Sequence, residues 1–296
     1  MLSPPELSIQ AQDFKSAGVG LVGLCATASL DWRGFLPGGR NNEEYLSSIA
    51  ERGPCAISGV IRCDTQAKTP MRPRPKALIA WSSGKDSAWA LHEVRRAGEV
   101  EIVGALTTVT SAFGRVSIHG LREELLRMQL DACKLSSIVI HIPYPCPNEV
   151  YEREMAAAMA QAKANGITHV IFGDLFLQDV RAYREQRLAP IGMTPLFPLW
   201  QRPTDALARE MIAAGVDARI VAVDLNKLPK DFAGRRFDHA LLADLPAAVD
   251  PCGENGEFHS FVAAGPMLTH AVAVSIGETV ERDGCAYADL VADFVS

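Results

Sequence analysis

Short apolar runs alternate with segments of helical spacing between residues 76 and 200. The runs are rich in β-branched residues, and the segments that follow them repeat apolar residues every three or four positions. Strands are predicted at 77–81, 101–109, 137–143 and 169–174, with a fifth apolar run at 194–200, and helices at 85–97, 121–133, 149–166 and 179–187. This alternation predicts an α/β fold with a doubly wound, Rossmann-like parallel sheet.

The chain is expected to have three parts. Residues 1–75 hold seven prolines and only brief apolar patches, so no element of convincing length emerges there. We expect 1–75 to be an extension that is disordered or not native, 76–200 a domain built on the parallel sheet, and 201–296 a smaller α+β domain. Met71 stands just before the first predicted strand, so a chain that begins there is expected to fold. In the competing interpretation, aromatic residues of the extension pack onto the sheet.

Polar residues interrupt the apolar pattern in the stretch AWSSGKDSAWAL, residues 80–91. The turn Ser82–Ser87 links a strand to a helix, and its free N–H groups and the helix dipole favour an anion. Gly84 lets the backbone approach closely, Lys85 adds a positive charge, and the hydroxyls of Ser83 and Ser87 add donors. The turn is therefore predicted to hold phosphate. The alternative is a serine-capped helix on a sheet that binds no phosphate.

This turn is not a Walker A loop. The pattern G-x-x-x-x-G-K-[ST] requires glycine where the chain has Ile79, and serine or threonine where it has Asp86. A carboxylate at Asp86 would repel a phosphate unless a cation lay between them. The sequence therefore predicts Mg²⁺ bridging Asp86 to a triphosphate.

A second polar motif, DPCGENGEFHSFV, occupies residues 250–262. Asn255-Gly256 is a strong signal for a tight turn, and the alternation after it places Glu257, His259 and Phe261 on one face of a strand. Glu254 is expected close by across the turn. Two carboxylates and an imidazole could hold an ammonium ion and accept a proton from it. The alternative is a polar hairpin on the surface.

The fourth predicted strand ends in Gly173 and Asp174, at the rim of the sheet where ligands bind. The next helix carries charged residues, Arg181, Arg184 and Glu185. The GD pair could belong to a nucleotide or substrate site. Alternatively, Asp174 caps the helix and the charged residues form a solvated face.

Three other residues are weaker candidates. His119 begins the second helix at another strand end, where it could approach the adenine or ribose of a nucleotide, or could simply start the helix. Cys146 and Cys252 each stand beside a proline, but a lone thiol is more often an inert buried residue than a nucleophile.

Several of these motifs resemble a known family. SSGKDS resembles the SGGKDS pyrophosphate-binding loop of the PP-loop ATP pyrophosphatases, with Ser83 in place of a glycine. Within that superfamily, GDLFLQDVRAYRE (173–185), PLFPLW (195–200) and DPCGENGEFHSFV (250–262) are similar to the diphthine-ammonia ligase family. The resemblance runs from about residue 76 to 290. It implies ATP and Mg²⁺ as cofactors and a reaction in which a carboxylate is adenylated, pyrophosphate leaves, and ammonia then forms an amide.

The resemblance also implies roles for individual residues. The nucleotide-binding set is Ser82, Ser83, Gly84, Lys85, Asp86, Ser87, His119, Gly173 and Asp174, with Asp86 positioning the metal. The catalytic set is Lys85, Asp86, Glu254, Glu257 and His259, of which the last three serve the acceptor or the ammonium. Diphthine is a modified histidine of archaea and eukaryotes, whereas the alanine-rich texture and the GENGEFHSF motif resemble bacterial members. The acceptor, a small molecule or a protein side chain, is therefore left unidentified.

Charge and cysteine content narrow the alternatives. The formal net charge of -6 gives no global attraction for nucleic acid, and the seven cysteines include no C-x-x-C pair. These features disfavour a PP-loop tRNA-modifying enzyme, while a regulator that binds ATP without turnover stays open. Scattered thiols and the lack of a secretory or membrane-spanning stretch favour a cytoplasmic protein without membrane contact. A homodimer is also left open.

Overall fold

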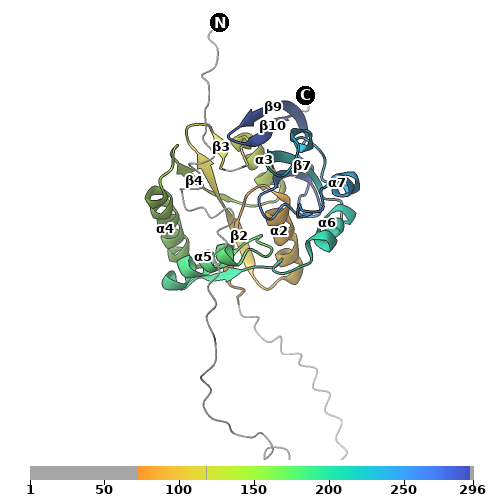
Figure 1. Cartoon of the computed structure of the whole chain (residues 1–296). Helices are drawn as coiled ribbons and strands as arrows, with labels where there is room; N and C mark the ends of the chain where they lie inside the picture. Colours follow the sequence, from red (N-terminus) through yellow and green to blue (C-terminus); the bar gives the residue numbers. More distant parts are fainter. Residues whose placement is uncertain (1–72, 118, 294–296) are drawn as a thin grey trace, which may run out of the picture. The chain divides into compact units, whose positions relative to one another are not determined.

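The computed structural model describes residues 73–117 and 119–293 (Figure 1). The predictions for the extension, including the start at Met71, lie outside these residues except at positions 73–75. Within the described part of the chain, no helix is long and apolar enough to cross a membrane.

A parallel sheet forms the first half of the described chain, as predicted. Its parallel strands lie in the order β4-β2-β1-β5-β6, and the short strand β3 pairs antiparallel with the end of β2. The strands are β1 (Lys76–Ala80), β2 (Glu101–Thr110), β3 (Arg115–Val116), β4 (Ser137–Ile142), β5 (Ile167–Ile171) and β6 (Thr194–Leu196). The order runs outward from β1 in both directions, which is the doubly wound arrangement.

Helices cover both faces of this sheet, and the alternation along β1 shows which face each helix covers. Ala77 and Ile79 join a hydrophobic cluster with residues of α2 and α3, whereas Leu78 joins a second cluster with residues of α4 and α5. The helices are α2 (Lys85–Ala97), α3 (Glu123–Ala132), α4 (Asn148–Ala164) and α5 (Gln178–Leu188), followed by the short helix η1 (Ala189–Ile191). Gly98 ends α2 in the left-handed conformation, which glycine adopts without steric strain.

The fifth apolar run is a strand only in its first three residues. Pro195 and Pro198 lack the N–H that extended pairing needs. Residues 197–200 instead form a turn, in which the Trp200 N–H donates to the Phe197 carbonyl at 3.2 Å. The difference matters for function because the turn carries its aromatic side chains to the carboxyl edge of the sheet.

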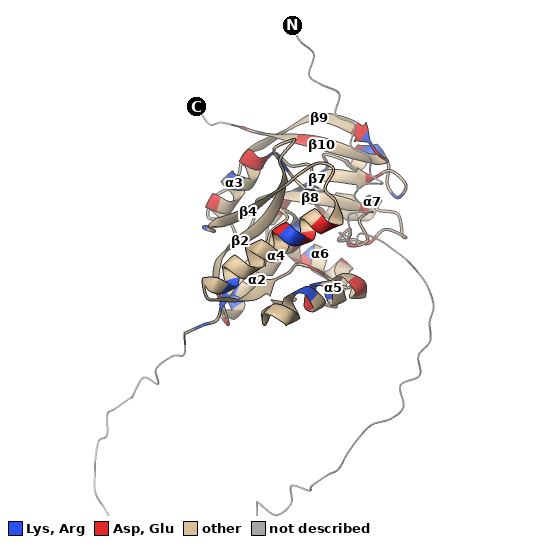
Figure 2. Cartoon of the chain, turned by 90° about the vertical axis from the view of Figure 1, so that its left-hand side faces the viewer, with Lys and Arg blue, Asp and Glu red and all other residues tan. Residues whose placement is uncertain are grey.

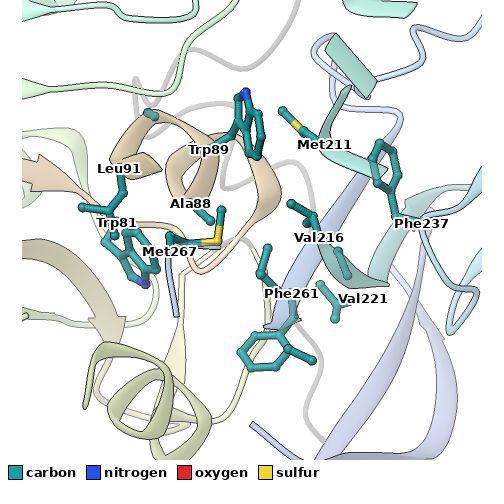
Figure 3. Close-up of a cluster of buried hydrophobic side chains, with 14 of the residues drawn as sticks. Trp81, Ala88, Trp89, Leu91, Met211, Val216, Val221, Phe237, Phe261 and Met267 are labelled. Atoms are coloured by element: carbon teal, nitrogen blue, oxygen red, sulfur yellow. The ribbon is translucent and has the colours of Figure 1, made fainter. Parts of the chain in front are cut away.

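A four-stranded antiparallel sheet, in the order β8-β7-β10-β9, forms the predicted α+β part. Its strands are β7 (Asp217–Asp224), β8 (Phe258–Ala264), β9 (Val274–Arg282) and β10 (Cys285–Ala292), and its helices are α6 (Thr204–Ala213), η2 (Lys230–Phe232) and α7 (His239–Asp244). One hydrophobic cluster includes buried residues of both α2 and this sheet. Figure 3 shows Trp89 of α2 near Met211 of α6, and Phe261 of β8 in the same cluster. The boundary at residue 200 therefore crosses a shared core and stays a prediction.

Candidate functional site

The strand order reverses between β1 and β5, so a ligand is expected beyond the carboxyl ends of these two strands. The turn Ser82–Ser87 follows β1, and Gly173 follows β5 after one intervening phenylalanine. These segments touch: a Cβ placed on Gly173 would lie 2.8 Å from the carbonyl carbon of Asp86 and 2.8 Å from the nitrogen of Ser87. Gly173 is therefore required by close backbone packing, which brings the GD pair against the predicted phosphate turn.

Serine hydroxyls shape the turn from inside. The Ser82 hydroxyl accepts the N–H of Gly84 at 3.3 Å and lies 3.2 Å from the Ser87 hydroxyl. The Ser87 hydroxyl donates to the Gly84 carbonyl at 3.0 Å. Gly84 is the N-cap of α2 and makes no side-chain cap. Apart from the Lys85 N–H, which the Ser260 hydroxyl accepts, the first N–H groups of α2 therefore remain at the turn, where an anion would find them.

Ser83 occupies a backbone conformation that favours glycine. Its φ is 69°, it is completely buried, and its hydroxyl oxygen has no hydrogen-bond partner among the described residues. This left-handed region is sterically unfavourable for serine, because of its Cβ, but not for glycine. The commoner SGGKDS pattern, with glycine at this position, fits the observed backbone for that reason.

Strand β8 of the second sheet docks on the turn. The Val262 N–H donates to the Ser83 carbonyl at 3.0 Å, and the Ser260 hydroxyl accepts the Lys85 N–H at 3.2 Å. The segment that holds the GENGEF motif is thus built onto the loop at the switch point. Local sequence could not show this pairing, because about 175 residues separate the partners in the chain.

Gln129 of α3 completes this junction, although the sequence did not single it out. Its side-chain amide donates to the carbonyls of Ser83 (3.0 Å) and Val262 (2.7 Å), and its oxygen accepts the indole N–H of Trp81 at 2.9 Å. Gln129 is completely buried. The sequence held one indication of this role. Gln129 stands four residues after Leu125, on the apolar face of α3, where a buried polar side chain needs hydrogen-bond partners.

The Lys85 side chain lies inside the junction, with 2% of its surface exposed. Its ammonium donates to Asp86 Oδ2 at 2.9 Å and to the Cys252 carbonyl, and it lies 5.2 Å from the centre of the Phe258 ring. Burial acts to lower the pKa of Lys85, but Asp86, Cys252 and Glu254 outweigh it and raise the pKa. The lysine therefore supplies a fixed positive charge between the phosphate turn and residues 250–258.

Asp86 keeps one carboxylate oxygen unengaged. Oδ2 pairs with Lys85, while Oδ1 is buried without a partner among the described residues. Burial raises the pKa of Asp86 against the opposing effect of Lys85. Mg²⁺ commonly uses one or two carboxylates together with substrate phosphates, so the free Oδ1 fits such an ion. In the described ranges, no group of three or more His, Cys, Asp or Glu side chains could hold a metal without phosphates.

The DPCGENGEF segment is organised by two carboxylates, the half-buried Asp250 and the buried Glu257. Asp250 accepts the N–H groups of Cys252 (2.9 Å) and Glu254 (3.2 Å). Glu257, 2% exposed, accepts the Asp250 N–H at 3.1 Å and the Asn255 amide at 3.0 Å, while its second oxygen has no partner in the described part of the chain. The alternative of a polar surface hairpin is therefore wrong.

Strand β8 differs in extent from the predicted strand that included Glu257. It begins at Phe258, so Glu257 precedes it, and Phe258, Ser260 and Phe261 are all buried. Successive side chains of a strand point to opposite faces, so burial of neighbours means that both faces are covered. The cover is provided by α2 and the rest of the hydrophobic cluster, which the alternating pattern could not indicate.

Glu254 connects this segment to the loop after β5. Its Oε1 accepts the N–H groups of Leu175 at 2.8 Å and Phe176 at 3.4 Å. Burial and then the nearby charge of Asp86 raise the pKa of Glu254 to about 7. Glu254 can therefore exchange a proton near neutral pH, which suits a general base.

His119 and His259 lie together at the turn, from different sheets. Their ring centroids are 4.7 Å apart, and a Cβ on Gly84 would lie 3.1 Å from Cε1 of His119. Burial, then His259 and Lys85, hold the pKa of His119 well below its usual range. Burial, then Lys85 and Lys227, lower the pKa of His259 to about 4. Both imidazoles are neutral at pH 7, so His259 is a weaker base than Glu254.

Asp174 does not cap a helix. Helix α5 begins at Gln178, and the Asp174 carboxylate instead accepts two hydrogen bonds from Arg184, at 2.5 and 3.0 Å. Cys252 is buried, and its thiol donates to the Thr204 carbonyl at 3.3 Å. Burial raises the pKa of both Cys252 and Cys146, which keeps the two thiols protonated at pH 7.

The fold and the site together define a doubly wound α/β protein with an anion-binding turn at its switch point and a second sheet built onto that turn. Comparison with known proteins finds partial likenesses to one family. Residues 203–288 match the diphthamide synthase C-terminal domain. The chain is 30% identical over 118 residues to the diphthine-ammonia ligases of Rattus norvegicus and Homo sapiens, which covers 38% of this chain and 44% of each relative. It is 26% identical over 96 residues to the Schizosaccharomyces pombe diphthine-ammonia ligase, covering 31% and 16%.

These matches support the resemblance: over part of its length the chain is similar to diphthine-ammonia ligases. The matched region spans less than half the length of the curated relatives. What those relatives act on is therefore carried to this chain only as a proposal.

Proposed function

We propose that the protein is an ATP-dependent amide-forming ligase that adenylates a carboxylate, releases pyrophosphate and transfers ammonia to the activated group. One observation carries the proposal. The phosphate turn and the GENGEF segment form a single buried junction around Lys85, whose ammonium bonds both Asp86 and the Cys252 carbonyl. A nucleotide bound at the turn would thus lie against the segment that marks the family.

ATP would be held by the turn with its phosphates toward α2. The free N–H groups at the start of α2 and the hydroxyls of Ser82 and Ser87 would donate to the β- and γ-phosphates, and Lys85 would supply positive charge from behind the turn. Ser83 would act through its backbone, because its hydroxyl is completely buried. Mg²⁺, held by Asp86 Oδ1 together with the phosphates, would neutralise their charge.

The proposed reaction has two steps. An oxygen of the acceptor carboxylate attacks the α-phosphorus, and the bond from that phosphorus to the bridging oxygen breaks, which releases pyrophosphate. The nitrogen of ammonia then attacks the acyl carbon, and AMP leaves with the electron pair of the acyl–oxygen bond. The turn would stabilise the charge that develops on pyrophosphate, since its donors are fixed before the reaction.

Ammonia must lose a proton during the second step, and Glu254 is the group best suited to accept it. The pKa of Glu254, about 7, lets the carboxylate attract ammonium and then take its proton. Its hydrogen bonds to the N–H groups of Leu175 and Phe176 fix one carboxylate oxygen beside the GD pair. Glu257, buried and bonded to Asp250 and Asn255, would keep the segment in shape for this role.

The test is pyrophosphate release from Mg-ATP in the presence of ammonium, across a panel of carboxylate metabolites and carboxylate-bearing peptides. A carboxylate that supports pyrophosphate release, and that is converted to an amide only when ammonium is present, would identify both the reaction class and the acceptor. Asp86→Asn is expected to abolish release, since it removes the charge that positions the metal. ATP binding without release for any acceptor, or equal rates for wild type and Asp86→Asn, would reject the proposal.

A further inference from the structure

Three aromatic rings form a row at the carboxyl edge of the parallel sheet. Phe172, next to β5, stacks on Phe197 with centroids 5.5 Å apart and planes at 23°. Phe197 in turn lies 5.8 Å from Trp200, with planes at 58°. The Gln201 N–H donates to the Leu175 carbonyl at 2.7 Å, which fixes the turn beside the loop that holds Glu254. The ring row therefore adjoins the proposed amidation site.

Two arginines of α5 lie over these rings. The guanidinium carbon of Arg184 is 4.4 Å from the centre of Phe172, and that of Arg181 is 4.8 Å from Phe197 and 4.7 Å from Trp200. A guanidinium that rests on aromatic faces is held in a defined orientation. Figure 2 shows the acidic and basic residues that α5 carries. Both arginines are thus fixed on the side of the helix that faces the site, and neither belongs to a freely solvated face.

The two guanidinium groups differ in their partners. Arg184 binds a carboxylate through two hydrogen bonds, which Asp174 accepts from Nε and Nη2. Arg181 donates only from Nε, to Glu185 at 2.7 Å. Among the residues that the structure describes, its terminal nitrogens have no hydrogen-bond acceptor, and the side chain is 33% exposed. Arg184 therefore already binds a carboxylate through two nitrogens, while both terminal nitrogens of Arg181 remain available to a ligand.

We propose that Arg181 binds a carboxylate of the acceptor other than the one that is adenylated, so that the acceptor carries at least two carboxylates. This inference rests on the proposed function. Lys85 and Arg184 already pair with Asp86 and Asp174, so the terminal nitrogens of Arg181 are the guanidinium donors left to attract a second carboxylate of the acceptor. The Asp174–Arg184 pair, one helical turn along α5, shows that a guanidinium on these rings can hold a carboxylate through two hydrogen bonds. At Arg181 the Nε donor is taken by Glu185, so a ligand carboxylate would use the two terminal nitrogens.

The test measures binding without turnover. Trp200 lies against Arg181, so a carboxylate that binds there should change its fluorescence. Glutarate is titrated into the full chain in the absence of ATP and ammonium, and glutaramide, its neutral diamide, serves as the uncharged counterpart. We expect a saturable change with glutarate alone and a midpoint at least about tenfold higher for Arg181→Gln. Trp200→Phe should remove the signal.

Arg187→Gln is the matched control variant. Arg187 belongs to the same helix, lies over the Tyr183 ring at 5.1 Å and pairs with Glu152, yet it has no place in the ring row. Its variant should keep the wild-type midpoint. Equal midpoints for wild type and Arg181→Gln, or no saturable change with glutarate, would overturn the proposal.

A second measurement concerns catalysis. Where pyrophosphate release is found, glutarate should be preferred to butyrate, and Arg181→Gln should raise KM for glutarate with little change in kcat, as expected for loss of uniform binding. Equal kcat/KM for glutarate and butyrate would contradict the proposal. If glutarate binds through Arg181 but no acceptor supports pyrophosphate release, the ligase function fails and the anion site stands, so the two failures are distinguishable.

Discussion

Replacing Gln129 with leucine tests whether this residue holds the junction between the two sheets. The change preserves approximate size but removes three buried hydrogen bonds, to Trp81, Ser83 and Val262. Each is worth about 1 kcal/mol net, and the indole N–H of Trp81 would be left buried without an acceptor at a cost of about 1–3 kcal/mol. Added burial of the leucine side chain offsets part of this. We expect a net loss of about 3 kcal/mol in the free energy of unfolding.

The assay is thermal unfolding of the full chain with and without Mg-ATP. A loss of about 3 kcal/mol corresponds to a fall in Tm of about 6–12 °C for a domain of this size. ATP affinity should fall as well, because the Ser83 carbonyl that Gln129 holds belongs to the phosphate turn. Gln161→Leu makes the same chemical change at an exposed position of α4 and should alter stability by no more than about 0.5 kcal/mol. A Tm for Gln129→Leu within about 2 °C of wild type would refute the reasoning.

Three further changes test other parts of the site. Since the pKa of Glu254 is about 7, amide formation should rise with pH through that value, and Glu254→Gln should remove the inflection; an unchanged pH profile would contradict the assignment. The folded-state pKa of Glu254 lies above the ordinary 4.5, so the stability that its protonated carboxyl contributes is complete below about pH 4.5 and is lost as pH rises through about 7. Glu254→Gln should also remove this trend from the profile of Tm against pH. Ser83→Gly should stabilise the protein by about 1 kcal/mol, because it relieves a positive φ and removes a buried hydroxyl without a partner; a lower Tm would show that the hydroxyl is used. Glu257→Gln keeps an oxygen for the Asp250 and Asn255 donors, so ATP affinity by calorimetry should persist; amide formation should fall, because the variant removes the negative charge that would attract ammonium. Loss of ATP affinity would assign Glu257 to the nucleotide.

The sequence alone determined the parallel sheet and the position of the phosphate turn. Strand and helix periodicities are local, and the rule that ligands bind at the carboxyl ends of parallel strands then placed Ser82–Ser87 and Gly173 at one edge. These conclusions needed no knowledge of which residues meet across the chain.

Only the tertiary structure decided what surrounds the turn. Three sets of hydrogen bonds join segments that lie from 46 to 167 residues apart in the chain. They are the three bonds of Gln129, the bond from Leu175 to Glu254 and the bond from Lys85 to the Cys252 carbonyl. Alternation along β8 correctly indicated a strand, but it could not reveal that a second layer covers its other face, so a surface hairpin stayed open. The role of Asp174 was undecided for the same reason. Its partner, Arg184, lies on the following helix. The sequence around an aspartate before a helix is the same whether the carboxylate caps that helix or accepts two hydrogen bonds from an arginine.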